Sequence, residues 1–253
     1  MTRIANNEGV IHGEDRPLGT AILMNEIYRA QVGEPIGYFW GYKTAGVFQN
    51  QEEINKWRAA GNGFAQSDPQ PGDLKYVDLN HDGIINDNDK TNIGDPHPDF
   101  RLGFGFNVAY KGLDFSVTTQ GAFGNKIFFA YRNYTRKALE RWHGEGTSDR
   151  FPRLGTGAVI TTDLSDINLE KGDYLKIQNV TLGYDFKRLL PGMPFQQLRL
   201  YVQAQNLYTF TGYPGMDPEV GFGGDTDHAW VSGIDIGSYP SPRTFLVGLS
   251  IKY

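Results

Sequence analysis

The sequence is dominated by long stretches in which apolar and polar positions alternate. The first covers residues 100–110, where every second position is apolar and the positions between are polar or small. Because successive side chains of a strand point to opposite faces, this alternation predicts a long strand with one aromatic face. Lys111 and Gly112 then predict a tight turn, after which residues 113–117 resume the alternation. We therefore expect a long hairpin.

The same pattern returns at residues 173–186, 197–210 and 244–253. In the last of these, the apolar positions are Phe245, Val247, Leu249, Ile251 and Tyr253. Short turns alternate with very long connections, the former at 111–112 and 190–195 and the latter at 45–99, 122–173 and 208–243. The chain is therefore predicted to be all-β and antiparallel, with its short turns at one end of the sheet.

Two architectures fit this alternation. In a soluble sandwich the apolar side chains meet a second sheet, strands average about 5–6 residues and turns are short at both ends. In an outer-membrane barrel the strands are about 9–11 residues long, and short turns at one rim face long loops at the other. The pattern favours a transmembrane β-barrel segment, and a soluble all-β module remains the alternative.

The long connections contain two candidate helices. In residues 50–63, Asn50 is a predicted N-cap, Glu53 occupies the capping-box position, Glu52 can pair with Lys56, and Gly61 ends the helix. Residues 128–146 form the second candidate. Both are too short to make a domain, so they are expected to decorate loops.

Composition excludes several functional classes. The absence of cysteine removes disulfide frameworks, thiolate zinc sites and cysteine nucleophiles. The five histidines stand alone, without an HExxH motif, and no G-x-S-x-G elbow occurs. Asp217 and Glu219 cannot be paired across a cleft from sequence alone. We expect no catalytic residues and no enzyme activity.

The net charge of −5 is concentrated in one region. Seven aspartates and two lysines lie between Asp73 and Asp99, so the rest of the chain is formally balanced. This local acidity favours a cation, and nothing in the distribution suggests a nucleic-acid surface.

Within the acidic region, residues 78–89 have the spacing of an EF-hand-like calcium loop. Calcium takes six to eight oxygen ligands, and Gly83 stands where such a loop turns sharply. The predicted ligands are Asp78, Asn80, Asp82, the carbonyl of Ile84, Asn86 and Asp89. A solvated, Asx-rich turn is the alternative interpretation.

Two features of this loop favour a structural role for calcium. Asp89 stands where a sensor EF-hand has a longer, bidentate glutamate, which would reduce affinity. Pro96 and Pro98 follow too soon for an exiting helix, so the helix pair of a calcium switch is not expected. Dockerin modules use a similar loop, which makes a soluble carbohydrate- or protein-docking module the alternative function. A dockerin, however, carries two such loops in a mostly helical domain.

Several stretches taken together resemble the C-terminal part of the SusC/RagA-like TonB-dependent outer-membrane transporters. They occur in the order of that family and cover most of the chain. The matching stretches are residues 32–54, 72–100, 172–186, 198–221 and 239–253.

The resemblance implies a barrel of about 22 strands, closed by a separate plug, with long extracellular loops and a SusD-like surface lipoprotein over its mouth. Such transporters sit in the bacterial outer membrane, contact its lipid, and import glycan fragments or oligopeptides with energy delivered by TonB through the plug. The calcium loop would then lie in an extracellular connection. Loop aromatics such as Trp40, Trp142, Tyr213 and Trp230 could stack on sugar rings or simply pack within the loops.

The chain departs from that family in length. The signal peptide, TonB box, plug and first strands have no counterpart in residues 1–253, which are expected to form one C-terminal barrel portion of about eight strands. Tyr253 resembles the terminal aromatic that outer-membrane assembly machinery recognises. A sheet of this kind would keep open edges unless other strands close it.

Overall fold

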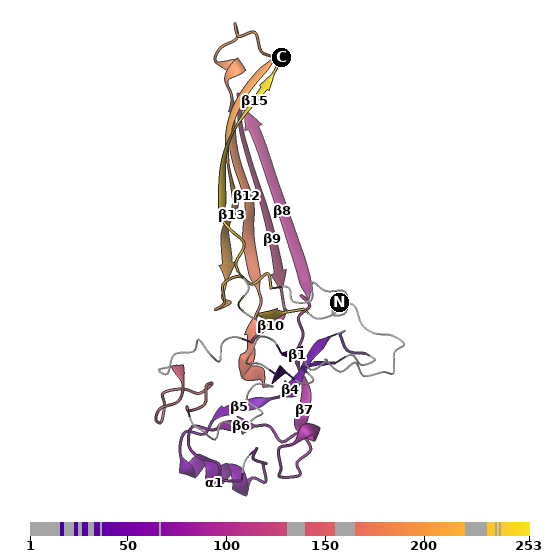
Figure 1. Cartoon of the computed structure of the whole chain (residues 1–253), viewed down its shortest axis with the longest axis vertical. Helices are drawn as coiled ribbons and strands as arrows, with labels where there is room; N and C mark the ends of the chain where they lie inside the picture. The colour runs from indigo at the N-terminus through magenta and orange to yellow at the C-terminus, as the bar shows by residue number, and fades with distance from the viewer. Residues whose placement is uncertain are drawn as a thin grey trace. The chain divides into compact units, whose positions relative to one another are not determined.

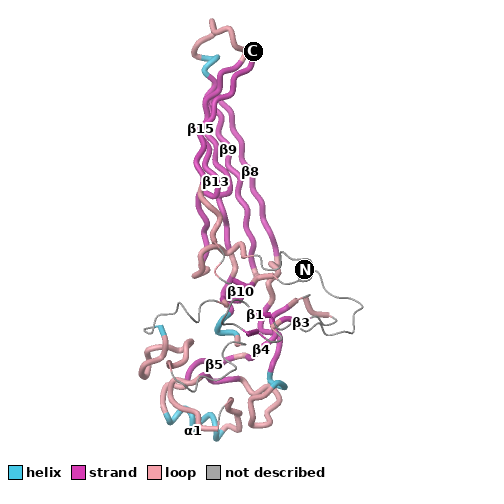
Figure 2. Tube along the Cα trace, viewed as in Figure 1, coloured by secondary structure: helices cyan, strands magenta, loops and turns pink. Residues whose placement is uncertain are grey.

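A computed structural model describes residues 16–17, 23–24, 27–29, 33–35, 37–65, 67–130, 140–154, 165–220, 232–235, 237 and 239–253. The chain is mostly strand, with one short α-helix in the described ranges (Figures 1 and 2). The elements are β1 (Arg16–Pro17), β2 (Leu23–Met24), β3 (Tyr28–Arg29), β4 (Tyr38–Tyr42), β5 (Thr44–Val47), α1 (Gln51–Ala59), β6 (Leu74–Tyr76), η1 (Asp87–Asp89), β7 (Lys90–Gly94), β8 (Phe100–Tyr110), β9 (Leu113–Phe123), β10 (Lys126–Phe129), η4 (Asp166–Asn168), β11 (Leu169–Lys171), β12 (Tyr174–Asp185), η5 (Phe186–Arg188), β13 (Gln197–Thr211), β14 (Ile234–Asp235) and β15 (Thr244–Lys252).

The chain divides into two compact units whose segments alternate along the sequence. The loop unit comprises residues Met1–His97, Lys126–Glu170 and Val220–Gly237. The sheet unit comprises Pro98–Asn125, Lys171–Glu219 and Ser238–Tyr253. No helix in the described ranges is long and apolar enough to cross a membrane.

The sheet unit is built on one antiparallel sheet in the order β15-β13-β12-β9-β8 (Figure 1). Each of these long strands pairs with the next long strand in sequence, which is an up-and-down meander. The strands run from 9 to 15 residues, which confirms the predicted length. The described ranges contain five such strands where the sequence suggested about eight. That estimate assumed strands evenly spaced along the chain, whereas residues 124–173 separate β9 from β12 and residues 212–243 separate β13 from β15.

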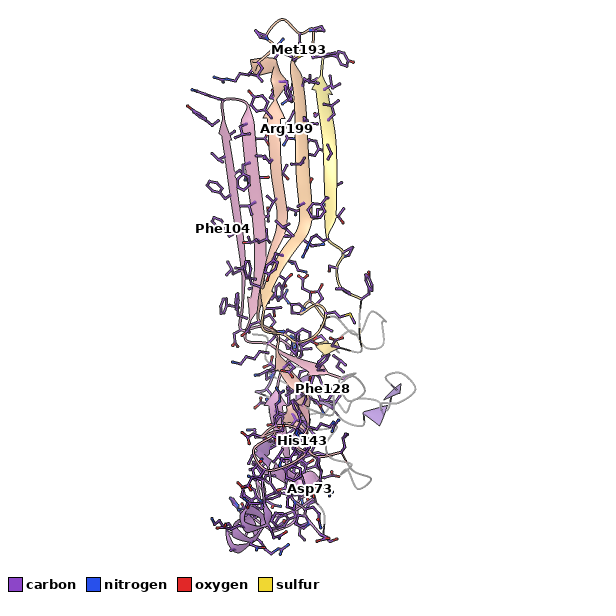
Figure 3. All side chains as sticks on the ribbon, turned by 90° about the vertical axis from the view of Figure 1, so that its left-hand side faces the viewer. Asp73, Phe104, Phe128, His143, Met193 and Arg199 are labelled. Atoms are coloured by element: carbon purple, nitrogen blue, oxygen red, sulfur yellow. The ribbon has the colours of Figure 1, made fainter. Side chains whose placement is uncertain are left out.

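Turns at one end of the sheet are short, as predicted. Lys111 and Gly112 join β8 to β9 with φ values of 49° and 88°, the left-handed pair that suits the twist of a two-residue hairpin. The β12–β13 connection begins with η5 and passes through Met193, labelled in Figure 3. Tyr253 packs edge-on against Phe195, with ring centroids 5.0 Å apart.

The loop unit has a buried core of its own. β3, β4 and β7 form one small sheet, β5 and β6 another, and β10 lies between β11 and β14 in a third. The cluster at the centre consists of Tyr42, Val47, Leu74, Tyr76, Ile85 and Ile167, with Ala65 and Trp142 packed against it. These residues come from several connections, so burial of their side chains is what holds the connections together.

Helix α1 confirms the first helical prediction. The side chain of Asn50 accepts from the backbone N–H of Glu53 at 3.0 Å, and Glu53 in turn accepts from the N–H of Gln49 at 2.8 Å. Lys56 pairs with Glu52 at 2.7 Å. Of the second candidate, residues 128–129 belong to strand β10 and residues 131–139 lie outside the described residues.

Candidate membrane wall and calcium loop

The register of the five strands gathers their apolar positions on one face. Across the sheet, Val108 lies opposite Phe115, Phe115 opposite Leu182, Leu182 opposite Val202 and Val202 opposite Val247. A one-residue slip of one strand would move all of its apolar side chains to the other face. We call this the apolar face; its large exposed side chains include Phe100, Leu102, Phe104, Phe106, Val108, Leu182, Leu200, Val202, Phe245, Val247, Leu249 and Ile251.

The exposure of the apolar face decides between the two sequence interpretations. Phe104, labelled in Figure 3, is 56% exposed and Val247 is 75% exposed. In a sandwich these inward side chains would be buried against a second sheet. A contiguous apolar surface of this size is not stable in water, so it requires a nonpolar environment.

The opposite, polar face carries charges and small residues. Arg199 on β13, labelled in Figure 3, binds Asp114 on β9 through two contacts, Nε to Oδ1 at 2.7 Å and Nη2 to Oδ2 at 2.5 Å. The pair passes over Gly183 of the intervening strand, where an added Cβ would lie 2.6 Å from both side chains. Gly248 similarly leaves room for the ring of Tyr201. Glycines on this face therefore make space for larger polar neighbours.

The segment that follows β13, residues 212–219, folds back onto the polar face, and we call it the strap. Lys176 of β12 is only 2% exposed, and its ammonium group contacts the carboxylates of Asp217, at 3.6 Å, and Glu219. The Tyr174 hydroxyl also donates to Glu219, at 2.9 Å. Ion pairs and hydrogen bonds therefore fasten the strap to β12.

Further contacts hold the strap in place beside a small cleft. Asp217 accepts from the N–H of Ser241 at 3.0 Å. Burial opposes ionisation of Asp217, but the N–H groups of Ser241 and Glu219 and the charge of Lys176 outweigh it and lower its pKa. A cleft of about 290 Å³ lies between strap and strands, and Thr209 and Arg243 are among its lining residues.

The predicted calcium loop joins β6 to β7 in the loop unit, and it is not followed by a helix. The exit is η1 and then strand β7, as the prolines predicted. Gly83 has φ +81°, the left-handed turn expected at that position. Ile85 is buried in the core cluster, which anchors the middle of the loop.

The first predicted ligand, Asp78, is 1% exposed. Its Oδ2 accepts from the N–H groups of Gly63 at 3.0 Å and Gly83 at 2.9 Å. Its Oδ1 is buried and has no hydrogen-bond partner. Oδ2 of this carboxylate therefore accepts two hydrogen bonds, whereas Oδ1 accepts none.

The other acidic ligands hold the backbone of the loop. Buried Asp89 accepts from the N–H of Leu79 at 2.9 Å and of Asn86 at 2.8 Å. Exposed Asp82 accepts from the N–H of Ile84 at 2.9 Å. That bond, together with the amides of Asn80 and Asn86, lowers the pKa of Asp82.

The structure therefore brings the six predicted ligands into one compact loop without forming a ready-made cluster. In the described part of the chain, no three Asp, Glu or His side chains gather closely enough to hold a metal. Asn80 and Asn86 turn their Oδ1 atoms to the N–H groups of Asp82, at 3.0 Å, and Asn88, at 2.9 Å. The calcium prediction stays a prediction at this point.

Two of the loop aromatics that could have stacked on sugars are packed. Trp142 contacts the core cluster and donates to Gln49 Oε1 at 3.2 Å, while Tyr213 in the strap is buried. Trp40 of β4 is partly exposed, with its ring edge-on to that of Tyr38. Trp230 lies outside the described residues.

The ion-paired strap is what sequence reasoning missed. Lys176 and Glu219 are 43 residues apart, and no motif connects them. The one available signal was a lysine between Leu175 and Ile177 in an alternating strand, which marks the polar face but not its partner.

A meander of strands this long, apolar and exposed on one face and polar on the other, defines the class of outer-membrane β-barrel walls. Among characterised proteins, the chain is 34% identical over 232 residues to the TonB-dependent receptor P3 of Formosa agariphila, covering 87% of this chain and 22% of that protein. It is 26% identical over 245 residues to the TonB-dependent receptor SusC of Bacteroides thetaiotaomicron, covering 90% of this chain and 23% of that protein. No family model matches.

Solved structures agree on the fold. The RagAB peptide transporter matches with a TM-score of 0.65 at 19% identity, over 91% of this chain and 24% of that chain. The RagAB peptide importer in its open-open state matches with a TM-score of 0.64 at the same identity. The sheet therefore has the arrangement of part of the RagA barrel.

The chain belongs to the SusC/RagA-like TonB-dependent receptors, and it spans about a quarter of the length of the characterised relatives it matches. This family consists of outer-membrane transport proteins and not of enzymes, which confirms the predicted location and the absence of an enzymatic role. The matches give no support to the docking-module alternative.

Proposed function

We propose that this chain is the C-terminal barrel portion of a TonB-dependent nutrient importer. In this function β8, β9, β12, β13 and β15 form part of a barrel wall of about 22 strands. The apolar face contacts outer-membrane lipid and the polar face lines the lumen. The continuous, exposed apolar face is the observation that carries this assignment.

The two edges of the sheet fit the same proposal. β8 and β15 are edge strands of the sheet in the described ranges, so each has one side that pairs with no neighbouring strand. Lipid cannot satisfy those backbone groups, which calls for further strands on both sides. The barrel strands of the rest of the importer would supply them, and a plug within the barrel would receive force from TonB.

The loop unit is assigned to the outer surface. Short turns join β8 to β9 and β12 to β13, long connections join β9 to β12 and β13 to β15, and in outer-membrane barrels the longer loops are extracellular. Because the RagAB peptide importer is a likeness in fold, a SusD-like lipoprotein is the proposed partner of this surface. Glycan fragments or oligopeptides are the proposed cargo.

The wall assignment can be tested by single-cysteine labelling, since the chain has no cysteine of its own. Val202→Cys places a thiol on the apolar face, and Gln203→Cys places one on the polar face of the same strand. In the assembled protein in lipid vesicles, a fluorophore at position 202 should be quenched by lipid-borne quenchers and one at 203 by aqueous quenchers. Equal quenching of both sites by aqueous quenchers would contradict the assignment.

Import is tested separately in cells. Deletion of the gene should abolish uptake of labelled oligosaccharides or of labelled oligopeptides, and complementation should restore it. Unchanged uptake of both classes would rule out the importer function, and loss of one class would identify the cargo.

A further inference from the structure

The buried carboxylate of Asp78 lacks a partner on one side. The side chain is 1% exposed, and Oδ1 has no hydrogen bond although Oδ2 accepts two. A buried charged oxygen is costly unless a hydrogen bond or a cation compensates it. The local structure therefore leaves a specific atom that calls for a positive ligand.

The position of this carboxylate directs it into the turn of the 78–89 loop. Oδ2 accepts from the N–H of Gly83, at the sharp turn, so the carboxyl group lies against the turn of the loop. The residues at alternate positions after it are oxygen donors. An ion at Oδ1 would lie on the side from which those donors can reach it.

We propose that this loop binds one Ca²⁺, with Asp78 Oδ1 as the first ligand. The remaining ligands are the side chains of Asn80, Asp82, Asn86 and Asp89 and the carbonyl of Ile84. Asp82 and Asp89 each turn one carboxylate oxygen from a backbone N–H to the ion, and the second oxygen keeps the loop hydrogen-bonded. Asn80 and Asn86 share their Oδ1 atoms between the ion and the N–H groups that they already accept from. Six oxygen donors, three of them charged, on an adaptable loop suit Ca²⁺ better than Mg²⁺, which demands near-ideal octahedral geometry.

The bound ion would fasten two parts of the loop unit. Asp78 also accepts from the N–H of Gly63, whose carbonyl accepts from the indole N–H of Trp57 in α1 at 3.2 Å. An added Cβ at Gly63 would lie 2.8 Å from the backbone nitrogen of Ile84, so the two segments are already in close contact. Calcium would therefore rigidify the α1 segment together with the entry to β7. The fluorescence of Trp57 in α1 should change when the ion binds.

The complete chain in detergent can be titrated with CaCl₂ by calorimetry and by tryptophan fluorescence, after removal of bound ions with a chelator. One equivalent should bind, the melting temperature should rise, and millimolar MgCl₂ should not displace it. Asp82→Asn, at an exposed side chain, and Asp78→Asn should each weaken binding by about tenfold or more. In chelator, Asp78→Asn should melt no lower than the wild type, because it removes a buried charge whose Oδ1 has no partner. Asp82→Asn should melt slightly lower, because hydrogen bonds already stabilise that carboxylate.

Asp87→Asn is the matched control, because it removes a charge from the same loop at a position that supplies no ligand. Asp87 contacts Lys90 at 2.9 Å and the Tyr42 hydroxyl at 3.3 Å, so it faces away from the proposed ion. Its calcium affinity should stay within about threefold of the wild type. No binding by the wild type at about 10 mM Ca²⁺, unchanged binding in Asp82→Asn, or equal weakening in all three variants would each overturn the proposal.

Discussion

The two units of the chain differ in whether their large apolar side chains are buried or exposed. The loop unit buries Phe39, Phe48 and Phe128 almost completely, as a water-soluble domain does. The sheet unit leaves Phe104 and Phe245 more than half exposed on its apolar face. One chain thus contains a unit that supplies its own nonpolar interior and a unit that needs a nonpolar environment from outside.

The charged side chains of the two units also differ in what they bind. In the loop unit, the buried carboxylates of Asp78 and Asp89 hold backbone N–H groups, and ion pairs such as that of Arg153 with Asp73 join separate connections. In the sheet unit, charges pair across strands on the polar face, as Arg199 does with Asp114. The comparison teaches that the same residue types fold connections in one unit and line a polar surface in the other.

The largest expected effect comes from placing a charge on the apolar face. Phe106→Arg, near the middle of β8, should destabilise the membrane-inserted protein by about 2–4 kcal/mol, because the guanidinium must enter hydrocarbon. Asn107→Arg, the next residue and on the polar face, is the control and should cost much less. Urea unfolding in lipid vesicles measures both. Equal costs for the two variants would break the distinction between the faces.

Removal of the buried lysine under the strap should have the next largest effect. Lys176→Met leaves Asp217 and Glu219 without their cation, which should cost about 1–3 kcal/mol after allowance for their partial exposure. The strap should then open, and a glutamate-specific protease should cleave after Glu219, whose carboxylate is held by Lys176 in the intact protein. Lys171→Met, at an exposed lysine, is the control. A cleavage rate no higher than that of the control would show that the ion pairs do not hold the strap.

The sequence predicted some of these features and not others, for physical reasons. Alternation predicted both faces of β8, and local capping chemistry predicted α1, because each depends on residues near in sequence. The turn at Lys111 and Gly112 was predictable for the same reason. The ion pairs of Lys176 depend on a loop that returns from far along the chain, so nothing local indicated them. The estimate of about eight strands assumed that strands are evenly spaced along the chain. The spacing of the long strands is uneven, because the connections of the loop unit fold on a core of their own.

Substitution of Gly63 tests the packing of the loop unit without changing its charge. Gly63→Ala would place a Cβ 2.8 Å from Ile84 N and 2.9 Å from the carbonyl carbon of Gly83, and backbone atoms cannot move aside as side chains can. The expected cost is about 1–3 kcal/mol. Thermal unfolding followed at Trp57 measures it. Gly144→Ala, where an added Cβ meets nothing nearer than 4.0 Å, should be nearly neutral.

The smallest effect, and the one confined most clearly to the loop unit, should follow removal of the α1 cap. Asn50→Ala leaves the N–H of Glu53 without its acceptor, and the loss of an N-cap costs about 1 kcal/mol. Asn50→Ser keeps a capping oxygen and adds no charge beside Glu145, to which the Asn50 amide donates at 2.7 Å, so it should restore most of that loss. Because α1 shares the core of the loop unit through Ile54, melting followed at Trp57 should fall with Asn50→Ala, while unfolding of the sheet in vesicles should not change. A parallel loss in both measurements would mean that the two units unfold together, and that the division between a self-sufficient unit and a lipid-dependent one does not extend to their stability.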